Sequence, residues 1–140
     1  MKSSLFITVF IIFATIGNVI GQIVGGLNDV DPAQYEPKAW QSVPEINTDN
    51  VGEYLWIPIE ITKAQVQVVA GKKIVLEVLV GDSDCPRDRK LAVSDIPEIC
   101  HVSNEGDRQL FQVDIWEKPW ENFENITVTK IRDVKQGEVL

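Results

Sequence analysis

The sequence predicts an α+β domain in which one long helix packs against a four- to five-stranded antiparallel sheet. Residues 37–50 place apolar side chains at helical spacing, whereas several later stretches alternate apolar with polar residues as half-buried strands do. Turn-forming or polar residues separate these later stretches, and a helix followed by consecutive hairpins is an α+β arrangement. The chain of 140 residues has room for one domain with a single core.

Residues 1–21 have the pattern of a secretory signal peptide. Lys2 supplies a positive charge, residues 5–16 form an apolar stretch, and residues 19–21 (Val-Ile-Gly) precede the expected cleavage site. A transmembrane helix is the alternative, but a span needs about 20 apolar residues and this stretch is shorter. We therefore expect a secreted, extracellular protein whose mature chain begins at Gln22.

The helix is expected within residues 31–50. Its apolar residues recur at spacings compatible with one helix face: Trp40, Val43, Ile46 and Tyr54. Pro37 is suited to a first helical turn, and residues 42–45 (Ser-Val-Pro-Glu) have the form of a capping box. Two interpretations stay open: a helix that begins near Pro37 and kinks at Pro44, or a new helix that begins after Ser42.

Strand patterns begin at Leu55. Ile57, Ile59 and Ile61 alternate with other residues, and the apolar phase then continues from Ala64 onward. Because this change of frame moves side chains to the other face, it indicates a bulge or bend in the strand.

Three further strands are predicted at residues 74–80, 111–115 and 126–131. A polar region holding both cysteines separates the first of these from the second. We therefore expect the folded domain to cover residues 22–132. The polar residues 133–140 are expected to form a flexible C-terminal tail.

Cys85 and Cys100 are the two cysteines, and an even pair in a secreted chain favours a disulfide. Closing that loop is worth about 3 kcal/mol in the chain-entropy model. The single histidine, His101, has no second Cys/His cluster near it, so neither a metal site nor a cofactor is expected. Asn125 begins an Asn-Ile-Thr glycosylation sequon, which fits the secretory route.

Charge and side-chain chemistry exclude several function classes. The formal net charge of −8 argues against nucleic acid or an anionic membrane as a partner. Nothing supports an enzyme, because His101 has no matching nucleophile and no glycine-rich phosphate motif occurs. Asp95 and Glu98 lie near His101 in sequence, but solvated loop charges explain them.

An unusual apolar turn lies within residues 65–78, between two valine-rich stretches. Its tip, Val69-Ala70-Gly71, carries no charge and no large side chain. Exposed hairpin tips are usually built from polar residues and glycine. An exposed apolar tip between two strands is an aggregation hazard, so this one calls for a functional explanation.

Three motifs occur in a fixed order along the chain: Gly25-Gly26, then residues 67–71 (Gln-Val-Val-Ala-Gly), then Pro119-Trp120. In order and separation they resemble the N-terminal glycine, the QxVxG signature and the second hairpin of the cystatins, which inhibit papain-like cysteine proteases. The resemblance covers nearly the whole mature chain. Residues 63–73, 85–87 and 116–123 are most similar to secreted, type 2-like cystatins of parasitic nematodes.

The resemblance implies the cystatin fold and reversible, competitive inhibition without a covalent bond. A papain-like active site is a narrow cleft with a thiolate–imidazole pair at its bottom, and a blunt apolar tip can enter it without presenting an attackable peptide bond. Val69 and Ala70, with Val68 beside them, would supply the apolar contact. Gly71 would permit a positive φ and close backbone approach, and Gln67 would hold the turn together.

Two further contacts are implied. Residues before this glycine pair would lie along the protease subsites, with Val24 in the pocket for an apolar side chain and Ile23 beside it. Gly25 and Gly26 would act as a hinge, and a frayed terminus is the alternative.

Pro119 and Trp120 would form the second wedge. Trp120 follows a proline at a turn and lies outside the strand alternation, so we expect it to be exposed rather than in the core. The other three tryptophans are assigned to the core or the sheet surface: Trp40, Trp56 and Trp116.

The chain departs from the family pattern in two places. Secreted vertebrate-type cystatins carry a second disulfide around the last hairpin, whereas Cys85 and Cys100 would correspond to the first bridge only. The last hairpin is therefore expected to be held by packing alone. In addition, Pro44 lies inside the expected helix.

Some cystatins carry a separate site against legumain, an asparagine-specific protease, in the loop after the helix. Asn47 and Asn50 lie in about that place, although Val51 follows Asn50 where an aspartate is expected. Helix-capping or turn roles for both asparagines are the favoured alternative.

The expected partners are cathepsin-type cysteine proteases, with legumain as a weaker candidate, and the protein is expected to be a monomer. The rival function is a non-inhibitory, cystatin-fold ligand that modulates host immune cells, either instead of inhibition or alongside it. The intact motifs at Gly25, residues 67–71 and Trp120 favour inhibition.

Overall fold

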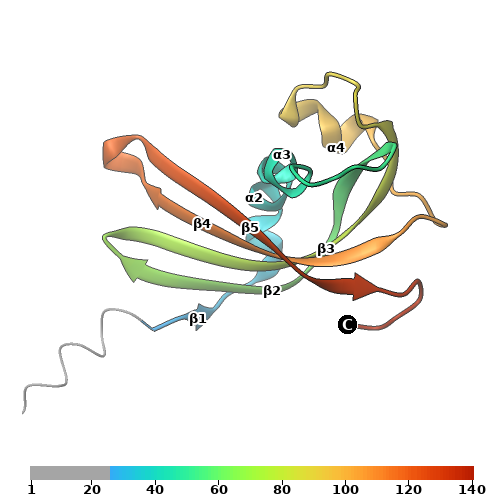
Figure 1. Ribbon diagram of the computed structural model, residues 1–140. Coiled ribbons are helices and arrows are strands. Elements are labelled where there is room, and N and C mark those ends of the chain that lie inside the picture. The colour runs from blue at the N-terminus through green and yellow to red at the C-terminus, as the bar shows by residue number, and fades with distance from the viewer. Residues whose placement is uncertain (1–25) are drawn as a thin grey trace, which may run out of the picture.

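The computed structural model describes residues 26–140, so the predicted signal peptide, Ile23, Val24 and Gly25 lie outside the described residues. Within them, five strands form one antiparallel sheet in the order β1-β2-β3-β4-β5. Short helices lie across one face of this sheet (Figure 1). The predicted α+β arrangement is confirmed.

The sheet is built from two long hairpins and one short edge strand. The strands are β1 (Asn28–Asp29), β2 (Tyr54–Val69), β3 (Gly71–Pro86), β4 (Arg108–Lys118) and β5 (Phe123–Val134). The sequence pattern underestimates their lengths, because backbone pairing continues past the apolar residues into polar ones at each end. The last strand reaches Val134, two residues beyond the expected end of the domain at residue 132, and the Val134 side chain is buried.

The predicted change of frame in β2 is confirmed. The pairing of β2 with β3 shifts register between Ile61 and Lys63, which returns the following apolar residues to the helix-covered face. From Ala64 onward the pairing runs without interruption to the tip of the hairpin.

The single long helix was a wrong expectation. A 3-10 turn η1 (Pro32–Tyr35) leads into α2 (Glu36–Gln41), which ends at Ser42, and a four-residue helix α3 (Val43–Ile46) follows. Pro44 explains the break, since proline has no backbone N–H and its ring crowds the carbonyl four residues earlier. Ser42 satisfies the end of α2: its buried hydroxyl donates to the Ala39 carbonyl at 2.6 Å.

The main core lies between the helices and the sheet. It contains Ala39 and Ile46 from the helices and, from the strands, Ala64, Ile74, Leu76, Val78, Val80, Phe111, Val113 and Ile115. The central strand β3 supplies four of these side chains, each at most 1% exposed. Burying one such aliphatic side chain contributes about 1.5–3 kcal/mol. The other face of the sheet, which carries the alternate residues and which no helix covers in Figure 1, is called the open face below.

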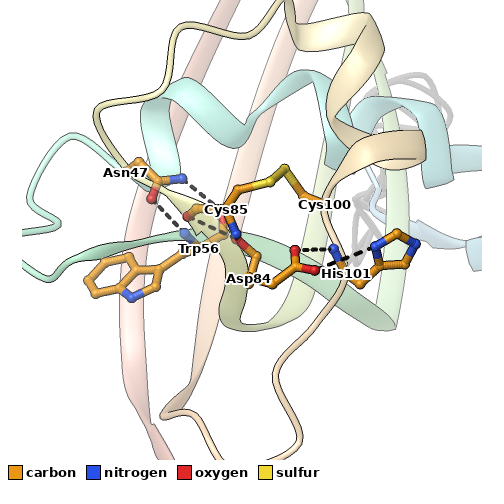
Figure 2. Close-up of a disulfide and its surroundings, with 7 residues drawn as sticks. Asn47, Trp56, Asp84, Cys85, Cys100 and His101 are labelled. Carbon is orange, nitrogen blue, oxygen red and sulfur yellow. Dashed lines mark hydrogen bonds and ion pairs between the residues drawn. A yellow bond between two sulfur atoms is a disulfide. The ribbon is translucent and has the colours of Figure 1, made fainter.

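A second cluster lies at the end of the sheet away from the hairpin tips (Figure 1). The 3-10 turn η2 (Val93–Asp95) leads into α4 (Ile96–Ile99), whose Ile96 packs there against Val43 and Ile57. The predicted Cys85–Cys100 disulfide is present in this cluster, with its Cα atoms 5.5 Å apart (Figure 2). The disulfide therefore fixes the polar region after β3 and not the hairpin tips.

Candidate functional site

The apolar tip is the end of the β2–β3 hairpin. Val69 and Gly71 are paired across it, and Ala70 alone lies between them. Gln67 is a strand residue paired with Lys73, so it lies before the turn and not within it. Because strand pairing continues to the last residue on each side, the tip is narrow.

Gly71 is required at this tip for two reasons. Its φ is +91°, a conformation that side chains other than glycine rarely adopt. A Cβ at this position would also overlap the backbone carbonyl of Glu117 on the adjacent strand β4. The positive φ predicted from the sequence is confirmed, and the close backbone approach occurs within the protein itself.

The exposed apolar surface at the tip belongs mainly to Val68 and Ala70. Val68 is 63% exposed and points to the helix side of the sheet, beyond the end of the core. Val69 is half-buried, because it points to the open face and lies beside Trp116. An apolar side chain as exposed as Val68 gains free energy when a partner removes it from water.

The second hairpin joins β4 to β5 through a 3-10 turn, η3 (Pro119–Glu121). Asn122 closes the turn in the left-handed conformation, with φ of 50°, which asparagine tolerates better than most residues. Trp120 lies at the crest of the turn and is 66% exposed. The expectation that Trp120 is exposed is confirmed.

The two hairpins are joined by Trp116. Its indole Nε1 donates a hydrogen bond of 3.0 Å to the backbone carbonyl of Ala70, at the tip of the first hairpin. The Trp116 ring packs edge-on against Phe123 at 5.4 Å, and the Lys118 ammonium lies 4.4 Å from the centre of the indole. The tip of the first hairpin is thus bonded to β4 just before the turn of the second, and Figure 1 shows both hairpin tips at the same end of the sheet.

The second hairpin is also tied to α2 by ion pairs. The Lys38 ammonium lies 3.0 Å from Glu117 on β4 and 2.9 Å from Glu124 on β5. Gln41 donates a further side-chain hydrogen bond to Glu124. The expectation that packing alone holds this hairpin is therefore wrong, because charged groups also bridge it to the helix.

Burial and charge act in opposite directions on Lys38. Partial burial by itself lowers its pKa, but hydrogen bonds and charge attraction from Glu124 and Glu117 outweigh that effect. The pKa of Lys38 therefore lies above its ordinary value, and the side chain carries its charge at neutral pH.

Sequence reasoning missed Trp116 and Lys38 as residues that hold the two hairpins in place. A signal for Trp116 was present, because it follows the buried Ile115 in a strand and must point to the opposite face. No local pattern indicates Lys38, since its partners Glu117 and Glu124 lie far away in sequence.

Gly26, the described member of the N-terminal glycine pair, lies on the side of β1 that faces the first hairpin tip. Asn28 pairs with Val66 in antiparallel register, so residues 26–27 lie toward the tip end of β2. A Cβ placed on Gly26 would meet no atom within 4 Å, so Gly26 has open space around it. Gly25, Val24 and Ile23 lie outside the described residues.

Asn47 and Asn50 form part of the scaffold. The Asn47 amide donates to the backbone carbonyl of Trp56 and accepts from its N–H, at 2.9 and 2.8 Å (Figure 2). Asn50 is 1% exposed and donates to Asn47 and to the Tyr54 carbonyl, both at 2.8 Å. Arg87 donates to the Asn50 carbonyl. The turn role favoured for these asparagines is confirmed.

The remaining candidates lie apart from the hairpin tips. His101 is near the disulfide, where its backbone N–H donates to Asp84 at 2.8 Å and its ring Nδ1 lies 3.7 Å from the same carboxylate (Figure 2). Among residues 26–140, no group of three or more His, Cys, Asp and Glu side chains is placed to hold a metal ion. No helix in the same residues is long and apolar enough to cross a membrane.

Comparison with known proteins identifies the class. The family model described as the cystatin domain matches residues 25–133, and the chain therefore belongs to the cystatin family, a family known for inhibitors of cysteine proteases. Cystatin cpi-1 of Caenorhabditis elegans is 49% identical over 129 residues, which cover 91% of this chain and 93% of that protein. Onchocystatin of Onchocerca volvulus is 32% identical over 117 residues, covering 80% of this chain and 69% of that protein.

Solved structures show the same fold. The crystal structure of Al-CPI has a TM-score of 0.63 and 30% identity, covering 76% of this chain and all (100%) of that one. The crystal structure of dimeric human cystatin F has the same TM-score of 0.63 at 23% identity, covering 78% of this chain and 88% of that one. The second likeness concerns the fold alone. The predicted family and fold are confirmed.

Proposed function

We propose that this protein is a reversible, competitive inhibitor of papain-like cysteine proteases of the cathepsin type. Its wedge would consist of the N-terminal lead (Ile23, Val24, Gly25 and Gly26), the tip (Gln67, Val68, Val69, Ala70 and Gly71) and the second turn (Pro119 and Trp120). One observation carries the proposal: the indole of Trp116 donates a hydrogen bond to the Ala70 carbonyl. This bond holds the exposed apolar tip of the first hairpin beside the second hairpin, whose turn exposes Trp120.

The chemistry of the edge supports binding without cleavage. Val68, Ala70 and Trp120 offer apolar surface to a cleft, and none of these side chains can act as a nucleophile or base. The tip closes a continuous hydrogen-bonded hairpin through a tight turn with a positive φ at Gly71, so its peptide bonds do not take the extended form of a cleavable substrate. Pre-formed projections also bind with little ordering cost, which favours tight association.

The proposed setting is extracellular. The signal-peptide pattern of residues 1–21 and the Cys85–Cys100 disulfide both support secretion, since disulfides persist in oxidising compartments. We expect the mature domain to begin at Gln22 and to act as a monomer.

Legumain is a weaker candidate target. Asn47 and Asn50 would have to offer a side chain to an asparagine-specific pocket, but both are used inside the protein, and Asn50 is buried. A role as a non-inhibitory ligand of host immune cells is the alternative, and the exposure of Val68, Ala70 and Trp120 favours inhibition over it.

The decisive experiment titrates residues 22–140 against papain and a panel of cathepsins. We expect competitive inhibition with no covalent adduct in the mass of either protein, and full recovery of protease activity on dilution. No inhibition at micromolar concentrations would overturn the proposal and leave the non-inhibitory ligand as the better account.

A further inference from the structure

The open face of the sheet contains a hollow directly behind the first hairpin tip. Its walls are the side chains of Gln67, Val69, Lys73, Asp114, Trp116, Asn125 and Thr127, and its volume is about 490 Å³. That volume falls within the range of about 300–1,000 Å³ that small-molecule sites occupy. This site is called the open-face hollow below. Gln67 and Val69 also belong to the proposed wedge, but the side chains that offer apolar surface to a protease, those of Val68, Ala70 and Trp120, do not line the hollow.

The sequon asparagine is itself a wall of this hollow. Asn125 on β5 is exposed and pairs directly with Trp116 on β4, so that both side chains project from the same face. Thr127, the hydroxyl residue of the sequon, lies two residues further along the same face and pairs with Asp114. A sugar attached to Asn125 would therefore start inside the hollow, next to an aromatic ring.

We propose that an N-linked glycan at Asn125 lies in the open-face hollow and packs its first N-acetylglucosamine against the indole of Trp116. In the attachment step, the sugar passes from a lipid diphosphate-linked oligosaccharide to the Asn125 amide nitrogen. The bond from the sugar C1 to the phosphate oxygen breaks, the C1–N bond forms, and the amide proton leaves as the lipid diphosphate is released.

The chemistry of the walls suits a pyranose ring. The C–H hydrogens on one face of the sugar carry a small positive charge, and the face of an aromatic ring is negative, so the two faces attract each other. Lys118 and Phe123 pack on Trp116 but do not line the hollow, so the ring keeps a surface on the hollow side. Asp114, Lys73 and Thr127 add charged and hydroxyl groups that can bond to sugar hydroxyls and to the acetamido group.

The placement has two consequences. Val68, Ala70, Pro119 and Trp120 are exposed and do not line the hollow, so a sugar seated in it leaves these four residues free while it lies against Gln67 and Val69 on the strand behind the tip. The sugar also joins β5 to the Trp116 indole in the hairpin that no disulfide crosses, because Cys85–Cys100 is the one disulfide and lies at the other end of the described domain. The glycan is expected to brace the hairpin, and this inference does not depend on which protease is bound.

The test expresses residues 1–140 in a eukaryotic secretory host that attaches high-mannose glycans. A parallel version carries a host signal peptide in place of residues 1–21, so that a failure of the native leader is separated from a failure of the sequon. The intact mass is measured before and after complete deglycosylation, and after trimming to a single N-acetylglucosamine. The matched unglycosylated variant is Thr127→Val, which removes the sequon but keeps Asn125 and a β-branched side chain of the same shape on the strand.

We expect a glycan on Asn125, and a melting temperature about 3–6 °C higher with one N-acetylglucosamine than in Thr127→Val. This difference should largely remain in Trp116→Phe, which keeps an aromatic ring, and disappear in Trp116→Leu. A secreted chain without carbohydrate overturns the proposal, as does a melting temperature unaffected by the sugar. A stabilisation that is equal in Trp116→Leu and in the wild type also overturns it, because the sugar would then act without the indole.

Discussion

The indole of Trp116 donates a hydrogen bond of 3.0 Å to the backbone carbonyl of Ala70. This contact joins a strand of the second hairpin to the tip of the first, two segments separated by all of β3, the polar region after it and most of β4. The donor is a rigid, partly exposed ring and the acceptor is a turn carbonyl that no strand partner satisfies by pairing. The position of the tip therefore depends on a residue that belongs to a different hairpin.

Replacing Val68 by aspartate should weaken inhibition of papain by at least tenfold without lowering the melting temperature by more than about 2 °C. The side chain is 63% exposed, so a charge there costs little in the free protein but must be desolvated in an apolar cleft. The inhibition constant and thermal unfolding measure the two effects.

The matched control for this change is Val51→Asp. Val51 is 92% exposed and lies in the loop before β2, away from the hairpin tips. The control should leave the inhibition constant unchanged. Equal inhibition by both variants would show that the Val68 side chain does not enter the cleft.

Gly71→Ala should destabilise the fold by about 2–4 kcal/mol and weaken inhibition. The positive φ alone costs about 1–2 kcal/mol for a residue with a Cβ, and the overlap with the Glu117 carbonyl adds to it. The free energy of unfolding in urea is the appropriate measurement.

Gly137→Ala separates the two causes. Gly137 has a φ of +78°, but a Cβ there would meet no atom within 4 Å. This control should show only the cost of the backbone conformation, about 1–2 kcal/mol at most. If the two variants lose the same stability, the contact with Glu117 is unimportant.

The two tryptophans at the edge should differ in what they affect. Trp120→Ala should raise the inhibition constant by about 30-fold or more, which corresponds to about 2 kcal/mol, with an unchanged melting temperature because the ring is largely exposed.

Trp116→Phe removes the hydrogen bond to Ala70 but keeps a ring, and it should raise the dissociation rate several-fold with little change in the association rate. Stopped-flow kinetics distinguishes them, and an unchanged dissociation rate in Trp116→Phe would contradict the role given to that contact.

Lys38→Met should lower stability by about 1 kcal/mol at neutral pH, since the side chain is partly exposed and the ion pairs are screened. The pKa of Lys38 is raised in the folded protein. Its contribution is therefore complete below the unfolded pKa of about 10.4 and is lost as the pH rises through the higher folded pKa.

The difference in melting temperature between Lys38→Met and wild type should stay constant from about pH 7 to 9 and shrink above about pH 10.5. Lys130→Met is the control, because the Lys130–Asp133 pair lies at a more exposed position and joins residues of one strand. A difference for Lys38→Met that persists unchanged at pH 11 would contradict an ionic origin.

Asn50→Ala should reduce stability and leave any legumain inhibition as it is in the wild type. The change removes the bonds to Asn47, to the Tyr54 carbonyl and from the Gly52 N–H, which are partly buried, at a cost of about 1–2 kcal/mol. Selective loss of legumain inhibition in a variant that remains stable would instead support the asparagine-specific site.

Much of this molecule could be predicted from local patterns. The alternation along β2 and β3, the bulge after Ile61, the disulfide and the exposure of Trp120 all follow from residue types at short spacings. Such features depend on backbone propensity and on one face of the segment being apolar, and both can be read from the residues of that segment alone. The broken helix was open in the sequence because Pro44 allows either a kink or a new start.

The sequence by itself determined the family, the three short motifs and the need for glycine at position 71. Only the tertiary structure decided what holds them together: the Trp116 bond to Ala70, the Lys38 bridge to Glu117 and Glu124, and the burial of Asn50. The reason is physical, since these contacts join side chains whose neighbours are fixed by strand register and helix position. The pattern of residues along one segment does not show which charged or aromatic side chain from another segment will lie beside it after folding.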